Sequence, residues 1–206
     1  ENATVENLRT KLELLQKRIK PEDVFLFFYA GHGIMNDPAD GSKPDFHLVL
    51  HKVTQMEGNE TMLRENAMSA TGLKDLLLKI SAQKQLILID ACNSGGAITT
   101  FTRGVGEEAA IFQLARSTGF TVLSSTNQDQ FATEVKAIGH GIFTYALLNG
   151  LNGEADLKND GKITVKEIEL YLNDIIPLLS EKYKGSQQFP QSFSRGMDFP
   201  LTIKAK

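Results

Sequence analysis

The chain has a single cysteine, no excess of positive charge and no long apolar run. Its 206 residues include one cysteine, Cys92, which excludes an internal disulfide and suits a reducing compartment, so we expect a cytoplasmic protein. The formal net charge of −3 gives no electrostatic reason to expect nucleic acid or a membrane as a partner. No apolar run approaches the ~18 residues that cross a bilayer, and no signal peptide is found.

The rest of the composition, 41% hydrophobic and 23% charged, is that of one soluble globular domain. Continuous apolar runs, typical of strands in a parallel sheet, are found at 24–30, 86–90 and 121–125. Helical periodicity is found at 4–19, 71–80, 107–116, 140–151 and 164–179. The tail at 185–201 has no regular pattern before a last short strand. Strands that alternate with helices predict an α/β sandwich with a mainly parallel central sheet.

Two of the predicted strands end in similar Gly-rich turns, each of which carries one reactive side chain. The first strand reads VFLFFYAGHG and leads to His32, and the second reads LILIDACNSGG and leads to Cys92. Open parallel sheets build their sites at the carboxyl ends of their strands. His32 and Cys92 can therefore be neighbours in space, and such a pair is the minimum equipment of a cysteine hydrolase.

These two motifs resemble those of the caspase-like cysteine peptidases (peptidase C14 type), and among them the bacterial and metacaspase-like branch. Metazoan caspases carry Gln-Ala-Cys-x-Gly at the nucleophile, whereas the segment 90–95, DACNSG, is closer to the Asp-x-Cys-x-Ser-Gly of metacaspases. Further similar stretches are found at 122–134 and 139–164. The resemblance extends over residues 4–202 and implies a caspase-like α/β/α sandwich, with residues 1–206 forming one peptidase domain.

The resemblance also implies a longer protein. Such folds normally open with a strand, whereas this sequence begins at Glu1 without an initiator Met and has no strand before its first predicted helix. We interpret the chain as the catalytic domain of a longer polypeptide whose first strand is missing here. The expected partners are protein or peptide substrates and regulatory domains or subunits outside this chain.

The expected chemistry is peptide-bond hydrolysis by a thiolate. A free thiol has a pKa near ~8.5 and is mostly protonated at neutral pH, so His32 would take the proton of Cys92 and later protonate the leaving amine. The main-chain N–H groups of Gly33 and Cys92 are the natural oxyanion donors, as the resemblance also implies. No cofactor is expected, because one cysteine and scattered histidines match no zinc spacing.

Other interpretations stay open. A lone cysteine is usually a small buried hydrophobe, and a histidine after a strand is usually structural. The other histidines, His47, His51 and His140, lack a matching context, and we interpret them as structural. The chain could also be a catalytically silent scaffold that binds partners, or an acyl transferase such as a transpeptidase that keeps the Cys-His dyad.

Substrate choice depends on acidic residues near the two motifs. In metacaspase-like enzymes the acid at the position of Asp90 lines the pocket for the residue before the scissile bond, so the resemblance implies cleavage after Arg or Lys. Asp129 and Glu134 are further candidate substrate-binding acids. The alternatives are a helix-cap or loop-holding role for Asp90 and an ordinary surface position for Glu134. Another pocket acid of the family comes from a segment absent here.

Two further segments have candidate roles. Arg103, in the Gly-flanked stretch AITTFTRGVG, is a candidate self-cleavage site because it fits the expected specificity. The segment 156–167 has the spacing of a calcium-binding EF-hand loop, with Asp156, Asp160 and Glu167 at its positions one, five and twelve. Lys158 stands at position three, where a ligand oxygen is expected. We therefore favour a tight Asp-Gly turn between two helices over a calcium site.

Overall fold

The structure is a computed structural model that describes residues 2–36, 44–53, 60–91, 119–125, 134–135 and 139–203. In chain order its helices and strands are α1 (Val5–Gln16), β1 (Val24–Gly31), β2 (Gly33–Asn36), β3 (Asp45–Val49), α2 (Glu60–Asn66), β4 (Ala67–Ser69), α3 (Ala70–Leu77), β5 (Lys84–Ala91), β6 (Gly119–Ser124), β7 (Glu134–Val135), β8 (His140–Gly141), α6 (Ile142–Asn149), a π-type turn η1 (Gly150–Glu154), β9 (Lys162–Thr164), α7 (Val165–Lys184), β10 (Gln191–Arg195) and β11 (Pro200–Ile203). None of the helices in these ranges is long and apolar enough to cross a membrane.

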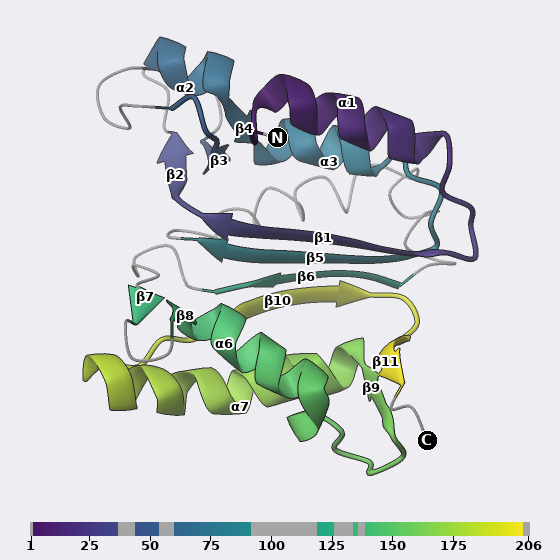
Figure 1. Cartoon of the computed structure of the whole chain (residues 1–206), viewed down its shortest axis with the longest axis vertical. Helices are drawn as coiled ribbons and strands as arrows, with labels where there is room; N and C mark the ends of the chain where they lie inside the picture. The colour runs from purple at the N-terminus through teal and green to yellow at the C-terminus, as the bar shows by residue number, and fades with distance from the viewer. Residues whose placement is uncertain are drawn as a thin grey trace.

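A central sheet organises the chain, with its strands in the order β1-β5-β6-β10 (Figure 1). β1, β5 and β6 are parallel, and β10 is antiparallel to β6. The predicted α/β sandwich with a mainly parallel sheet is therefore confirmed. The prediction for the tail is wrong in part, because residues 191–195 form β10 and complete the sheet beside β6.

Helices cover both faces of this sheet, as Figure 1 shows. On one face, α1 and α3 contribute Leu12 and Leu73 to a core that includes Ile87 of β5. On the other face, α6 and α7 pack against the alternate residues of β5, among them Leu86 and Leu88. Because burying one such side chain contributes about 1.5–3 kcal/mol, these two apolar layers hold the helices on the sheet.

β1 is an outer strand of the described sheet, and both of its faces are apolar. One face contacts the α1 and α3 layer, whereas Val24, Leu26 and Phe28 on the other face are 46%, 48% and 43% exposed. The register pairs Leu26 with Leu86 and Phe28 with Leu88, which are buried under α6 and α7. A strand that is apolar on both faces is typical of the interior of a covered parallel sheet. The second face of β1 is therefore an apolar surface of this chain.

Local signals explain where the helices begin and end. Thr4 caps α1 and Ser69 caps α3, each through a side-chain oxygen that accepts a main-chain N–H of the first turn. α7 begins with a capping box between Thr164 and Glu167, and it ends at Gly185, whose φ of 73° is the left-handed conformation that favours glycine. α7 extends five residues beyond its predicted end at 179. The predicted helix at 107–116 lies outside the described residues.

Candidate active site

The strands that precede His32 and Cys92 end side by side at one edge of the sheet. β1 and β5 run side by side in the same direction (Figure 1). Their register pairs Gly31 with Ala91, and these are the residues directly before His32 and Cys92. The predicted pairing of the two strands is thus confirmed. Cys92 itself lies outside the described residues, and the Cys-His dyad stays a prediction.

The main chain of His32 is fixed by two neighbours while its side chain is exposed to solvent. Its carbonyl oxygen accepts the Val49 N–H at 2.9 Å and lies 2.7 Å from the Tyr29 hydroxyl. Burial raises the pKa of Tyr29, against the effect of its hydrogen bond to the Val49 carbonyl, so the hydroxyl remains a donor. A Cβ on Gly31 would lie 2.7 Å from the Tyr29 hydroxyl, which explains why a glycine precedes His32.

The N–H of Gly33 is directed away from the neighbouring strand. Gly33 and Leu48 are partners in the antiparallel ladder of β2 and β3, and the Val49 N–H bonds to the His32 carbonyl. Gly33 and Leu48 are therefore a non-hydrogen-bonded pair, whose N–H groups point out of the ladder. This geometry suits the predicted use of the Gly33 N–H as an oxyanion donor.

Asp90 lies at the end of β5, and its carboxylate contacts the first turn of α6. The oxygen Oδ2 accepts the Thr144 main-chain N–H at 3.2 Å and the Thr144 hydroxyl at 2.5 Å. Gly141 is the N-cap residue of α6 and has no side chain with which to cap it. A Cβ on Gly141 would lie 2.7 Å from Oδ2, so glycine makes room for the approach of Asp90. This is the geometry of a helix cap supplied by another element.

Burial raises the pKa of Asp90, although the hydrogen bonds from Thr144 and Ser125 and the positive charge of Lys184 oppose the shift. Burial favours the protonated carboxyl because a charged group is costly away from water. The substrate-selecting role of Asp90 stays a prediction. The structure shows that the same carboxylate also caps α6.

The other predicted site residues are only partly described. Arg103 and Asp129 lie outside the described residues. The main chain of Glu134 pairs with Gly141, which places it near the Asp90 carboxylate at the carboxyl end of β5. His47, interpreted as structural, is buried with its ring Nδ1 3.3 Å from the carbonyl oxygen of Asp45.

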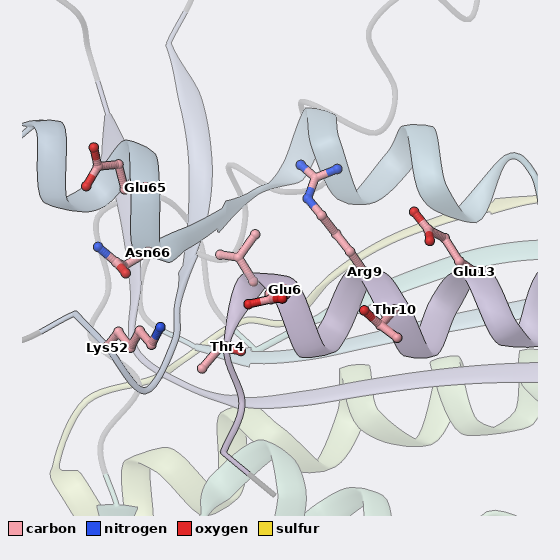
Figure 2. A pocket seen from close by; sticks show the side chains of 9 residues that line it. Thr4, Glu6, Arg9, Thr10, Glu13, Lys52, Glu65 and Asn66 are labelled. Atoms are coloured by element: carbon pink, nitrogen blue, oxygen red, sulfur yellow. The ribbon is translucent and has the colours of Figure 1, made fainter.

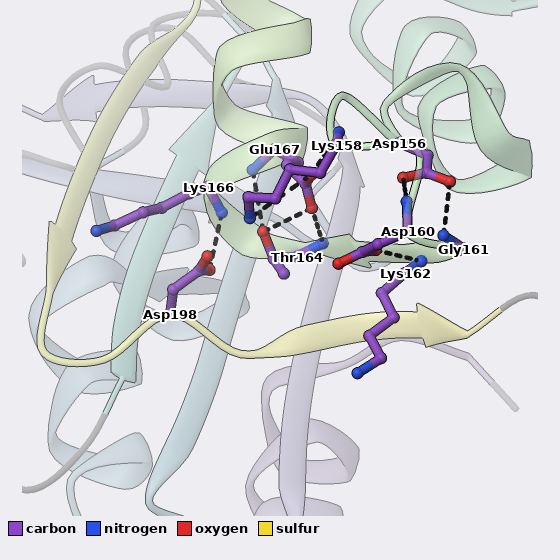
Figure 3. A network of polar contacts seen from close by, with 9 residues as sticks. All are labelled: Asp156, Lys158, Asp160, Gly161, Lys162, Thr164, Lys166, Glu167 and Asp198. Carbon is purple, nitrogen blue, oxygen red and sulfur yellow. Dashed lines mark hydrogen bonds and ion pairs between the residues drawn. The ribbon is translucent and has the colours of Figure 1, made fainter.

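The loop at 156–161 is held by its own carboxylates, as the dashed lines in Figure 3 show. The two oxygens of Asp156 accept the N–H groups of Asp160 and Gly161, each at 3.0 Å. Asp160 accepts the N–H of Lys162 at 2.9 Å. Two of the three acids of the predicted calcium set, Asp156 and Asp160, thus form the hydrogen bonds of a tight turn.

Glu167, the third acid of that set, is buried at the start of α7. Its carboxylate accepts the N–H and hydroxyl of Thr164 at 3.0 and 2.9 Å, and its Oε1 lies 3.7 Å from the Lys158 ammonium (Figure 3). Burial opposes the charge of Glu167, but the Thr164 hydrogen bonds and Lys158 together hold its pKa below the usual value.

These contacts agree with the favoured tight turn, and the calcium site stays an untested alternative. A lysine ammonium takes the place of a ligand oxygen and pairs with the acid at position twelve. Among the residues that the structure describes, no group of three or more His, Cys, Asp or Glu side chains is arranged to hold a metal ion.

A pocket of about 370 Å³ lies between the start of α1 and the α2 region (Figure 2). Its lining carries both signs of charge: Arg9 lies on α1 with the acids Glu6 and Glu13, and Lys52 and Glu65 lie on other segments of the lining. None of the predicted site residues that the structure describes lines this pocket.

Comparison with known families supports the assignment that the strand ends suggest. The family model for the caspase domain matches residues 1–201. The chain belongs to the caspase domain family. Its caspase domain therefore extends over nearly the whole sequence, and the family is one of peptidases, as the resemblance of the two motifs predicted.

A solved structure of similar fold is that of protein GSU0716 from Geobacter sulfurreducens. It matches with a TM-score of 0.60 and 19% sequence identity, over 99% of this chain and 78% of that chain. At this level of identity the likeness shows the fold alone. No curated protein matches the chain.

Proposed function

We propose that this caspase domain is a cysteine endopeptidase that cleaves protein substrates after Arg or Lys. The observation that carries the proposal is the pairing of Gly31 with Ala91, because it brings the strands before His32 and Cys92 to one edge of the sheet in a chain of a peptidase family. His32 has an exposed side chain on a fixed main chain, which suits a residue that must reach both a thiol and a substrate.

The proposed reaction has two stages. The Cys92 thiolate attacks the carbonyl carbon of the scissile bond after His32 has taken the thiol proton. The N–H groups of Gly33 and Cys92 stabilise the oxyanion, and the protonated His32 gives its proton to the leaving amine as the C–N bond breaks. A water molecule, deprotonated by His32, then hydrolyses the thioester and releases the carboxylic acid and the free thiol.

The preference for a basic residue is supported by the acidic character of the candidate pocket, in which Asp90, Asp129 and Glu134 are the contributors. Asp90 already accepts two hydrogen bonds from Thr144, so a substrate cation would meet a carboxylate that is partly satisfied. The test must therefore separate the three acids, and the charge-removing variants Asp90→Asn, Asp129→Asn and Glu134→Gln do so one at a time.

The experiment is a panel of fluorogenic peptides with Arg, Lys, Asp or Leu before the scissile bond. We expect cleavage after Arg and Lys by the wild type, and none by Cys92→Ala or His32→Ala. His51→Ala, which alters an exposed histidine in another turn, is the matched control and should keep wild-type turnover. The acid that selects the basic residue is the one whose variant loses the Arg and Lys substrates.

Each alternative gives a different result. Cleavage after Asp would keep the dyad and overturn the proposed specificity. Silence towards all peptides, together with no labelling of Cys92 by a thiol-reactive peptide probe, would identify a scaffold. A product mass that corresponds to a ligated peptide would identify an acyl transferase.

The proposal extends to cleavage of the chain by itself at Arg103. The intact mass of the purified wild type should then show two fragments that meet after Arg103, whereas Cys92→Ala should stay intact. Identical intact masses for the two proteins would remove self-cleavage from the proposal.

A further inference from the structure

A fully buried serine, Ser125, hydrogen-bonds to the main chain of Ala91, the last residue of β5. Ser125 directly follows β6, and its N–H extends the ladder to the Ile89 carbonyl at 3.0 Å. Its hydroxyl oxygen accepts the N–H of Ala91 at 3.1 Å and donates to the carbonyl oxygen of the same residue at 3.0 Å. A hydroxyl has one hydrogen and two lone pairs, so it can make both bonds at once, and the Asp90 carboxylate is a second acceptor for the same hydrogen. Ser125 thus holds both main-chain polar groups of Ala91.

The carbonyl of Ala91 belongs to the peptide group whose nitrogen is that of Cys92. A peptide group is planar and almost always trans, so the direction of its C=O fixes the opposite direction of its N–H. The hydrogen bond from Ser125 to the Ala91 carbonyl therefore acts on the orientation of the Cys92 N–H, which is one of the two proposed oxyanion donors.

The main chain of Ser125 is held in turn by a buried glutamine from the segment after α7. Gln188 donates from Nε2 to the Ser125 carbonyl oxygen at 2.6 Å, and its side chain is almost fully buried. Its own N–H bonds to the Ser180 hydroxyl at 2.7 Å, and its Oε1 accepts from the Lys184 ammonium at 3.1 Å. Two residues of α7 thus position Gln188 against the end of β6.

The neighbouring serine makes a useful contrast. Ser124 is also fully buried, yet its hydroxyl has no hydrogen-bond partner in the described structure. Burial is therefore the same for the two serines, and what distinguishes them is the hydrogen bonding of their hydroxyls. Of these two hydroxyls, that of Ser125 is the one that bonds to Ala91, the residue before Cys92.

From these contacts we propose that Ser125 and Gln188 are positioning residues, which together form a buried clasp that orients the Ala91–Cys92 peptide group for oxyanion stabilisation. The proposal rests on the proposed function, because an oxyanion forms only if Cys92 attacks a carbonyl. Loss of one oxyanion donor lowers kcat by about 10²–10³, and a misdirected donor should cost part of that effect.

The test compares Ser125→Ala with Ser124→Ala on the best peptide substrate. We expect Ser125→Ala to lower kcat about ten- to a hundredfold with KM changed less than about threefold, and Ser124→Ala to match the wild type. Ser125→Thr, which keeps a hydroxyl, should recover most of the lost kcat. The second pair is Gln188→Ala against Gln187→Ala, a neighbouring exposed glutamine, and only Gln188→Ala should lower kcat.

Alkylation of Cys92 by iodoacetamide separates positioning of the N–H from damage to the thiol. This reaction forms no oxyanion, so its rate and its pH profile should be the same in the wild type and in Ser125→Ala. Equal kcat values for Ser125→Ala and Ser124→Ala would overturn the proposal. A parallel loss of kcat and of alkylation rate would also overturn it, because the effect would then lie in the thiol or the fold.

Hydrogen exchange tests the clasp independently of the proposed function, because it does not depend on peptide cleavage. Amide exchange in residues 86–95 should be faster in Ser125→Ala than in Ser124→Ala, whether or not any peptide is cleaved. If the wild type cleaves nothing, the proposed function fails and the catalytic role of the clasp fails with it. Unchanged exchange in Ser125→Ala would overturn the clasp itself.

Discussion

The carboxylate of Asp90 on β5 accepts two hydrogen bonds from Thr144 in the first turn of α6. The residue two places before the proposed nucleophile therefore caps a helix that begins at Ile142, 52 positions further along the chain. The strand that carries the site and the helix that covers it are joined at this point by a polar contact in addition to their apolar packing.

Asp90→Ala should destabilise the protein by about 1–2 kcal/mol, because it removes the cap of α6 and leaves the Thr144 N–H without this acceptor. Asp90→Asn keeps an acceptor oxygen and should lose about half of that or less. Urea unfolding at pH 7 measures the difference. Equal stability of the wild type and Asp90→Ala would contradict the capping role.

The raised pKa of Asp90 predicts a specific dependence of stability on pH. The folded protein holds this proton more tightly than the unfolded chain does, so wild-type stability should fall as pH rises from the ordinary value of 3.8 through the folded pKa. Asp90→Asn lacks this contribution. The stability of the variant relative to the wild type should therefore increase with pH across that window and then level off, as measured by urea unfolding in a series of buffers.

Glu167 predicts the opposite dependence, since its pKa is lowered from 4.5. Its carboxylate contributes stability above that value, and the contribution is lost as pH falls through the folded pKa. Glu167→Gln should lose about 1–2 kcal/mol at pH 7 through the weakened capping box, and the gap to the wild type should narrow in acid. A gap that widened in acid would show that the charge of Glu167 is not what stabilises the start of α7.

The pairing of Lys158 with Glu167 predicts the response to calcium. The wild-type melting temperature should be unchanged by millimolar calcium, because an ammonium takes the place of a ligand oxygen. Lys158→Asp restores an oxygen at that position and should make the melting temperature rise with calcium but not with magnesium. A calcium-dependent rise in the wild type would show that the lysine does not prevent binding.

Tyr29→Phe should lower kcat several-fold and stability by about 1 kcal/mol, because it removes the hydroxyl next to the His32 carbonyl. Tyr183→Phe on α7 removes a hydroxyl from another part of the chain and serves as the control. Peptide turnover and thermal unfolding of both variants provide the measurement. If both variants kept wild-type turnover, Tyr29 would have no part in fixing His32.

The uncovered face of β1 predicts a contrast between register partners. Leu26→Thr should reduce the binding of the dye ANS and leave stability within about 1 kcal/mol, because Leu26 is 48% exposed and Thr suits a strand. Leu86→Thr, at the fully buried partner position, should cost about 2–5 kcal/mol. Similar losses of stability in both variants would mean that the face of β1 is covered in solution.

The sequence predicted the elements whose apolar pattern is strong. β1 and β5 are continuous apolar runs, and each agrees with its predicted range to within two residues at either end. β10 was missed because its residues alternate only between half-buried and exposed, so QSFSR lacks the apolar pattern of a core strand. Its partner β6 supplies the apolar side chains of that part of the sheet.

The surroundings of the candidate site carry less signal in the sequence than His32 and Cys92, whose dyad stays a prediction. His32 and Cys92 carry the signal of matching strand ends and Gly-rich turns. Ser125 and Gln188 carry no such signal, because a buried serine and a buried glutamine 63 positions apart become partners only when α7 returns the chain to the sheet. The role of Asp90 could not be decided from the sequence for a different reason. An acid at this strand end fits both a substrate pocket and a helix cap.

The position of β10 has a consequence for the synthesis of the protein. β6 obtains its antiparallel neighbour only from residues 191–195, which follow α7. A ribosome-bound chain that stops at Lys184 has made β1, β5 and both reactive residues, yet it lacks Gln188 and the strand that closes the sheet beside β6. The proposed site is therefore completed late, so a nascent or prematurely terminated chain carries Cys92 without the complete clasp.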